Sequence, residues 1–213
     1  VTALVCDVAN TASVHTMGGA PGTRETDLLA PENIIQGVNA FILSGGSSFG
    51  LDAASGAQAL FRKNKIGFET HGHHIPIVPA AILFDLVNGG DKDWGDINPY
   101  QKLGAEAVEC AATNFELGST GAGTGALVGG PGMGLKGGLG SASTVLANGV
   151  TVGALVAVNA MGAATMGESE HFWAAPFELD DEFGGLGMAD LPSSECHRVR
   201  LKYQDRQAEG TQT

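Results

Sequence analysis

Short apolar runs recur along the chain, each bounded by glycine, proline or polar residues. Runs of this length that are rich in β-branched residues are typical of strands, and runs that are apolar on both faces are typical of buried strands. We therefore expect strands, several of them buried, at Val1–Val8, Ala40–Leu43, Ile66–Thr70, Ile75–Phe84, Ser141–Leu146 and Val150–Val158.

Two segments have the spacing of helices instead. Ser48–Lys63 places Leu51, Ala54 and Leu60 towards one side, and Gln101–Asn114 repeats this pattern. Helices that cover a mixed sheet make an α/β layered fold.

The chain changes character after Gly162, where acidic residues crowd a stretch punctuated by glycine and proline. Its weak periodicity predicts an exposed excursion over about residues 166–194. The polar end of the chain predicts a flexible tail over about 204–213. The length suits a single domain covering 1–213.

Charge and composition limit the kinds of partner and compartment that we expect for this protein. Eleven Lys and Arg against 23 Asp and Glu give a net charge of −12, which disfavours nucleic acids and anionic membrane surfaces. The apolar runs are far shorter than the roughly 20 residues of a membrane-spanning helix. Cys6, Cys110 and Cys196 form no CxxC pair, which suits a reducing cytoplasm. The chain starts with Val1 inside a strand-like run, so we expect further residues upstream.

The sharpest local motif is Gly46–Gly50, a GxSxG sequence between a predicted strand and a predicted helix. This is the context of a nucleophile elbow with Ser48 as nucleophile. The other members of a triad follow in the required order, as Asp85 or Asp180 and then His171 or His197. The same turn also suits an ordinary strand end at which Ser47 or Ser48 caps a helix.

Two further motifs are weak. His71, His73 and His74 lie close together, but no helical HExxH spacing accompanies them, and a turn before Pro76 explains them equally well. Gly129–Gly138 is glycine-rich, but its lysine lacks the neighbours of a phosphate loop. We therefore expect neither a metal nor a cofactor.

Lys136 lies in that glycine-rich loop, and Asn159 ends the apolar run that begins at Val150. An asparagine at the end of a buried strand either caps a turn or donates hydrogen bonds in a site. An amide NH2 beside a lysine ammonium would suit the oxyanion that develops in acyl transfer.

Five segments, in order, resemble the DmpA-type aminopeptidases, a family that includes L-aminopeptidase/D-esterases, β-peptidyl aminopeptidases and nylon-oligomer hydrolases. The resemblance extends over roughly residues 1–160, and the segments are Gly18–Leu29, Leu43–Leu51, Pro76–Leu86, Leu135–Ser143 and Val156–Ala160.

The resemblance implies an αββα four-layer sandwich, similar to that of the N-terminal-nucleophile hydrolases and the ornithine acetyltransferases. It also implies a precursor that cuts itself before a Ser or Thr, which then acts as nucleophile with its own α-amine as base. This sequence resembles the larger chain, so the nucleophile is expected on a small C-terminal partner chain. The chain ends at Thr213, whereas Asn or Gly often precedes the cut in the family.

By the same resemblance, Lys136 matches the lysine near the nucleophile in the nylon-hydrolase branch, and Asn159 matches the oxyanion-hole asparagine. Gly46, Ser47 and Phe84 are expected on the substrate side. Phe84 replaces a Tyr found in several members, and so removes one hydroxyl donor.

The implied activity is hydrolysis of amide bonds in short peptides or in linear oligoamides such as 6-aminohexanoate oligomers, by a homo-oligomer of two-chain units. The motifs look unlike those of the transferases that share the fold. Two alternatives stay open: a single-chain serine hydrolase that uses Ser48, and a binding domain without chemistry.

Overall fold

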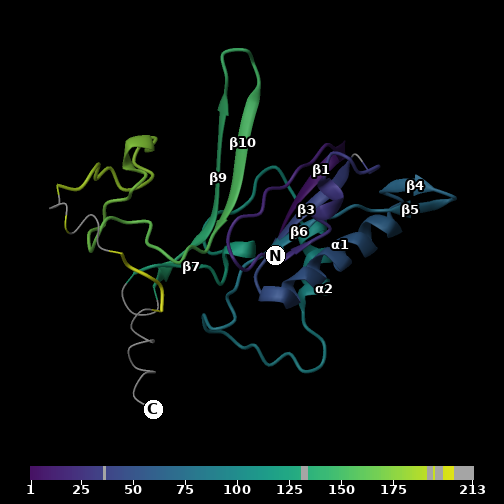
Figure 1. The fold of residues 1–213 in the computed structure, drawn as a ribbon, viewed down its shortest axis with the longest axis horizontal. Coiled ribbons are helices and arrows are strands. Elements are labelled where there is room, and N and C mark those ends of the chain that lie inside the picture. The colour runs from purple at the N-terminus through teal and green to yellow at the C-terminus, as the bar shows by residue number, and fades with distance from the viewer. Residues whose placement is uncertain (36, 131–133, 191–193, 195–198, 204–213) are drawn as a thin grey trace. The chain divides into compact units, whose positions relative to one another are not determined.

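The computed structural model describes residues 1–35, 37–130, 134–190, 194 and 199–203 (Figure 1). Contacts group the chain into two compact units, the first made of residues 1–126 and 138–157 and the second of residues 127–137 and 158–213. The tail predicted over about 204–213 lies outside the described residues. The single domain stays a prediction.

The first unit is built on a four-stranded mixed sheet in the order β1-β3-β6-β2. The strands are β1 (Thr2–Asn10), β2 (Thr23–Arg24), β3 (Val38–Ser44) and β6 (Ala80–Ile82). β3 runs antiparallel to β1 and parallel to β6, and β2 runs antiparallel to β6. The predicted mixed sheet is therefore confirmed.

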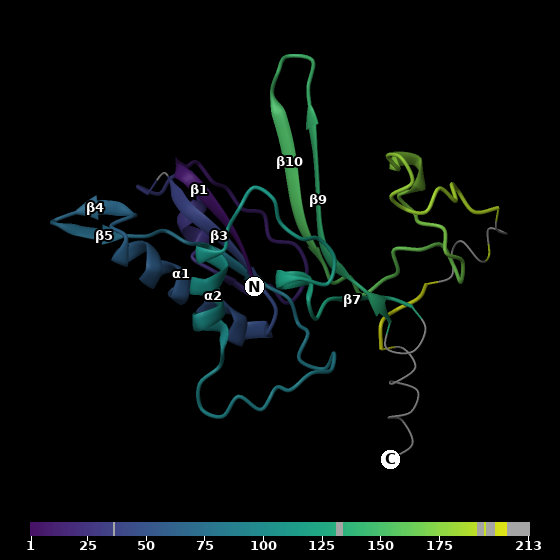
Figure 2. The same cartoon turned by 180° about the vertical axis from the view of Figure 1, so that it is seen from behind.

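Two helices pack against this sheet (Figures 1 and 2). α1 spans Asp52–Lys63 and follows the 3-10 helix η2, Ser47–Leu51, while α2 spans Tyr100–Glu109 and ends before the predicted Asn114. The core between helices and sheet is made mostly of small and branched apolar residues, with Phe61 and Tyr100 as its aromatic members. The α/β class is confirmed, and the four-layer arrangement stays a prediction.

The two helices approach each other through glycines. A methyl group built on Gly56 would overlap the carbonyl oxygen of Gln101, and one built on Gly104 would overlap the carbonyl oxygen of Ala53. Only residues without a Cβ allow backbones to come this close. The small residues of the predicted helices therefore set the distance between them.

The predicted strand Ile75–Phe84 is wrong as one element. It divides into the end of β5 (His73–Ile75), which pairs with β4 (Phe68–Thr70), and the separate strand β6. Pro76 and Pro79 lack the N–H that a continuous ladder needs. Asn39 bridges the gap, because its side-chain oxygen accepts the Ile77 N–H at 2.9 Å.

The hairpin of β9 (Gly138–Val145) and β10 (Thr151–Val158) contradicts the expectation of buried strands. Val152 and Val156 are each 50% exposed, and most other positions of both strands are exposed as well. A two-stranded ribbon has no second layer of its own, so its apolar side chains meet solvent. The hairpin is thus an uncovered apolar surface of the first unit.

The described residues of the second unit have little regular structure. It contains β7 (Leu127–Val128) paired with β8 (Leu135–Lys136) and a 3-10 helix η4, Ala175–Phe177. The predicted excursion 166–194 is mostly exposed where it is described, but Met166 at its start is 1% exposed. The first residue of the excursion is therefore buried, unlike most of those that follow.

Two short 3-10 helices complete the first unit, η1 at Asp27–Leu29 and η3 at Gly121–Gly123. Within the described ranges, no helix has both the length and the apolar character needed to cross a membrane. Cys6 and Cys110 are free thiols, and Cys196 lies outside the described residues.

Candidate active site

Gly46 and Ser47 form the turn that follows β3. Their φ angles are 82° and 55°, so both lie in the left-handed region, which glycine adopts freely and serine only at a cost. The turn is held from two sides. The Gly46 N–H donates to Oδ1 of Asp85 at 2.7 Å, and the Ser47 N–H donates to the Leu83 carbonyl at 2.9 Å.

Phe84 reaches the same edge of the sheet from β6. Because β3 and β6 are parallel, with Ser44 opposite Ile82, the turns that follow them leave the sheet at one edge. In α/β sheets this carboxyl edge is where ligands bind. Phe84 is 48% exposed there, so the structure gathers the three predicted substrate-side residues Gly46, Ser47 and Phe84 at one edge of the first unit.

Ser48 lacks the features of an elbow nucleophile. The strained positive φ of the motif falls on Ser47, while Ser48 lies exposed inside η2. The carboxylate of Asp85, a candidate triad acid, accepts the backbone N–H of Gly46. No side chain caps η2, so the expected serine cap is wrong and the Asp85 carboxylate fixes the turn instead.

The candidate triad bases give no support either. Nδ1 of His171 lies 2.9 Å from the Gly187 carbonyl within the second unit, and His197 lies outside the described residues. Asp180, the other candidate acid, sits in a left-handed turn with φ 54°.

Asp85 is a buried carboxylate, 7% exposed, enclosed by glycine backbone. A methyl group on Gly45 or on Gly125 would overlap its Oδ2. Burial, reinforced by the negative charge of Asp85, raises the pKa of Tyr100 to about 12. Tyr100 is therefore neutral at ordinary pH, and its ring packs edge-on against Trp94 with centroids 5.5 Å apart.

In the second unit, Asn159 forms a compact polar group with Leu127 and Lys202, which we call the Asn159 cluster. Oδ1 of Asn159 accepts the Leu127 N–H at 3.0 Å and the Lys202 ammonium at 3.0 Å. The same ammonium donates to the Asn159 carbonyl at 2.9 Å and to the Leu127 carbonyl at 3.3 Å. The amide is thus held by donors on its oxygen side.

Lys136, the other predicted catalytic residue, lies in β8 of the same unit. It is the ladder partner of Leu127, whose N–H donates to Asn159. Antiparallel partners have Cα atoms about 5 Å apart, so the backbone of Lys136 lies close to the Asn159 cluster. The side chain of Lys136 is exposed. Part of the glycine-rich segment Gly129–Gly138 lies outside the described residues.

Lys202 is the residue that sequence reasoning missed. It is 4% exposed, although it lies in a polar segment where no periodic apolar pattern marks burial. Desolvation lowers the pKa of its ammonium. The only local signal is its position between Leu201 and Tyr203, a short apolar interruption of the polar stretch.

The histidines at His71, His73 and His74 belong to the β4–β5 hairpin. His71 sits at the turn with φ 49°, and its Nδ1 lies 2.9 Å from the Thr70 hydroxyl. In the part of the chain that the structure describes, no group of three or more His, Cys, Asp or Glu residues is arranged to hold a metal ion. The turn explanation of these histidines is the one that the geometry favours.

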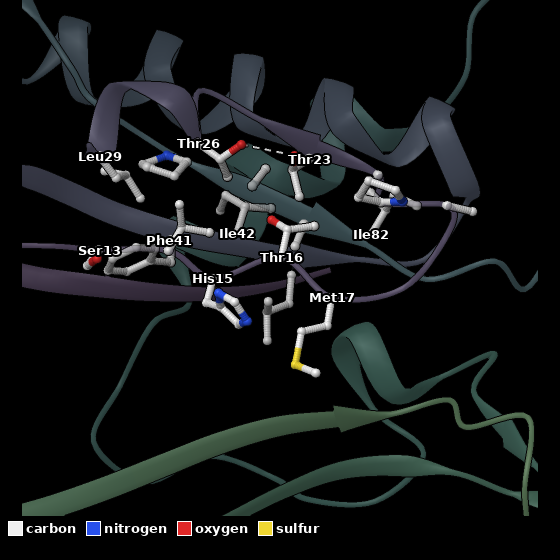
Figure 3. A pocket seen from close by; sticks show the side chains of 18 residues that line it. Ser13, His15, Thr16, Met17, Thr23, Thr26, Leu29, Phe41, Ile42 and Ile82 are labelled. Atoms are coloured by element: carbon white, nitrogen blue, oxygen red, sulfur yellow. Dashed lines mark hydrogen bonds between the residues drawn. The ribbon is translucent and has the colours of Figure 1, made fainter. Parts of the chain in front are cut away.

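A cavity of about 430 Å³ lies in the first unit, beside β3 and β6 (Figure 3). Its lining is apolar with scattered hydroxyl groups, and the Thr23 and Thr26 hydroxyls are hydrogen bonded at 3.0 Å. His15 is its one ionisable lining residue. Such a mostly apolar lining can hold an apolar group.

Comparison with known proteins relates the chain to peptidases. The profile of Peptidase family S58 matches residues 1–181. Proteins named uncharacterized aminopeptidase are similar: those of Mycobacterium bovis and Mycobacterium tuberculosis are 42% identical over 162 residues, and that of Mycobacterium leprae is 40% identical over 167 residues. Each match covers 76% of this chain and 45% of the relative, so the chain spans about half the length of the relatives it matches.

Proposed function

We propose, from the premise that this chain belongs to peptidase family S58, that it is the larger part of an amide-bond hydrolase. Its substrates are short peptides or linear oligoamides such as 6-aminohexanoate oligomers, as expected of a DmpA-type enzyme. The mycobacterial relatives named aminopeptidases support the peptide-hydrolase part of this proposal.

The observation that carries the proposal is the fixed amide of Asn159. Its oxygen accepts two donors, Leu127 N–H and the Lys202 ammonium, so its NH2 group is the edge that faces away from them. A preorganised N–H donor of this kind stabilises the oxyanion of a tetrahedral intermediate without reorganising during the reaction. Lys136, the ladder partner of Leu127, adds positive charge to the same region.

The nucleophile in this proposal is the new N-terminal Ser or Thr of a small chain cut from the same precursor. Its hydroxyl oxygen attacks the substrate carbonyl while its α-amine takes the proton, and the oxyanion is held by Asn159. The C–N bond then breaks, the leaving amine takes that proton, and water hydrolyses the acyl-enzyme ester.

The β9–β10 hairpin supports a partner chain, because it leaves apolar side chains such as Val152 and Val156 exposed. Exposed apolar surface of this kind marks an interaction site. We propose that the small chain covers it, and that two-chain units assemble into a homo-oligomer.

Substrate contacts are proposed for Gly46, Ser47 and Phe84, which share one edge of the sheet. A phenyl ring at position 84 offers apolar area rather than a hydroxyl donor, which suits a methylene-rich substrate. The free thiols of Cys6 and Cys110 support a reducing cytoplasm as its compartment.

The first test is the intact mass and N-terminal sequence of the full-length protein purified from cells. The proposal expects two polypeptides, the smaller one starting with Ser or Thr, and release of amine from peptides or 6-aminohexanoate oligomers. A single unprocessed and inactive polypeptide would contradict it.

Asn159→Ala in the full-length protein tests the oxyanion role. We expect kcat to fall by about 100-fold or more, as when a single oxyanion donor is removed. Ser48→Ala is the matched control, because it removes an exposed hydroxyl outside the proposed machinery. Loss of activity in Ser48→Ala with retention in Asn159→Ala would instead favour the single-chain serine hydrolase.

A further inference from the structure

The ammonium group of Lys202 lies in an unusual environment for a charge. Its side chain is 4% exposed, and its ammonium donates to three oxygens that are all carbonyl or amide oxygens, on Leu127 and Asn159. Burial among neutral groups lowers its pKa, so holding the charge there costs free energy. An apolar side chain of similar volume would remove that cost but would leave the three oxygens without this donor.

The ammonium also determines which way the Asn159 amide faces. A backbone N–H and a lysine ammonium can only donate, so the atom that meets Leu127 N and Lys202 Nζ must be the amide oxygen. A flipped amide would set NH2 against two donors. Lys202 and the Leu127 N–H together therefore select one of two orientations that differ only in exchange of oxygen and nitrogen.

The backbone around Lys202 is fixed within the second unit. The Lys202 N–H donates to the Met161 carbonyl at 2.9 Å, two residues beyond Asn159. Gly134, with φ 114°, lets the Lys202 side chain approach, since a methyl group there would lie 3.2 Å from the Lys202 Cβ. Lys202 is thus held against the segment that carries Asn159.

We infer that Lys202 is a positioning residue that orients Asn159 and strengthens its N–H donors for the oxyanion. A cation hydrogen bonded to an amide oxygen draws electron density from the amide, which makes the opposite N–H groups stronger donors. This inference rests on the proposed function, because it assigns Lys202 a role through Asn159. It involves no bond to the substrate, so Lys202 is not a catalytic residue.

The test compares Lys202→Met in the full-length enzyme with Lys63→Met, which removes an exposed lysine of α1. We expect Lys202→Met to lower kcat by roughly 10- to 100-fold with little change in KM, because the donors act on the transition state. Its melting temperature should change little, because the removal of a desolvated charge offsets the loss of a donor to the Leu127 and Asn159 oxygens. A kcat equal to that of Lys63→Met would overturn the inference.

Double mutants show whether the effect passes through Asn159. In the Asn159→Ala background, Lys202→Met should cost less than twofold in kcat, because the group that it orients is absent. Equal losses in both backgrounds would contradict a role through Asn159. An unimpaired Asn159→Ala enzyme would count against the proposed function instead, so the two failures are distinguishable.

Lys202→Arg separates positioning from packing. It keeps the charge and the donors but enlarges the side chain. Positioning predicts that Arg retains more kcat than Met, whereas a packing role predicts that the larger Arg is worse. The same comparison applies if Lys202→Met folds poorly, because Lys202→Gln can then replace it as the neutral variant.

Discussion

β3 and β10 are both strands with apolar residues at most positions, yet their environments are opposite. In β3, Ala40 and Ile42 are fully buried between neighbouring strands and helices. In β10, Val152 and Val156 are half exposed, in a hairpin with a single neighbouring strand. The difference shows that apolar content alone does not bury a strand, because burial depends on the strands and helices that pack against it.

The largest expected effect lies where the covering helices cross. Gly104→Val should destabilise the 213-residue chain by about 3 kcal/mol, because the added side chain must push α1 and α2 apart. Gly153→Val in β10 is the matched control, with no atom within 4 Å of the added Cβ, and it should change stability by less than about 0.5 kcal/mol. Denaturant unfolding measures the stability of the two variants. Equal losses of stability would contradict the difference between the covered and the uncovered region.

The next largest effect is expected in β10, and its size depends on whether the proposed small chain covers this strand. Val156→Asp should cost less than about 0.5 kcal/mol in this chain, where the side chain is exposed. It should cost about 2 kcal/mol or more in the full-length protein if the small chain buries that face. Ala147→Asp at the hairpin turn controls for the added charge. Thermal unfolding of the 213-residue chain and of the full-length protein measures the two effects. Equal small losses in both would mean that the hairpin stays exposed in the full-length protein.

Tyr100 reports burial in the covered region through its ionisation. Because its pKa is raised to about 12 from about 10 in the unfolded chain, the folded state binds more protons between these values. Stability should therefore fall as pH rises from about 10 to about 12. Absorbance of tyrosinate in a Tyr203→Phe background follows Tyr100 directly.

Asp85→Asn tests the secondary cause of that shift. It keeps an oxygen for the Gly46 N–H but removes the negative charge, so the pKa of Tyr100 should decrease while remaining above 10 because of burial. An unchanged titration would mean that burial alone raises the pKa.

The smallest effect is expected on the outer face of α2. Lys102 and Glu106 lie 3.6 Å apart, with side chains 82% and 49% exposed. Lys102→Ala should cost no more than about 0.5 kcal/mol, and the loss should vanish in 1 M salt, as for exposed ion pairs. A larger, salt-independent loss would show that this face is covered too, which would weaken the contrast between the regions.

Sequence reasoning succeeded where the local pattern and the environment agreed. Ser48–Lys63 became η2 and α1, and Ala40–Leu43 became β3, because apolar periodicity and tertiary cover point to the same structure there. It failed at Ile75–Phe84, where Pro76 and Pro79 interrupt an apolar run that is buried only over residues 76–80. The apolar composition of this run reflects the burial of its middle part. The prolines lack backbone N–H groups, however, and so prevent the hydrogen bonding of a continuous strand.

For the candidate site, the sequence marked Asn159 and Lys136 as candidates, because an amide at the end of an apolar strand and a lysine among glycines stand out from their surroundings. Their catalytic roles, and the substrate-side roles of Gly46 and Ser47, were implied by the resemblance to the DmpA-type family and stay predictions. The α/β class follows from patterns that depend on neighbours along the chain.

Tertiary structure decided what depends on contacts between distant segments. It brought the Lys202 ammonium to the side-chain oxygen of Asn159, 43 positions away in the sequence. It likewise brought the Asp85 carboxylate to the Gly46 N–H, 39 positions away. It also left β9 and β10 uncovered in spite of their apolar residues. Hydrogen bonding and burial at these positions are set by which segments meet in space, and nothing in the local order of residues encodes that meeting.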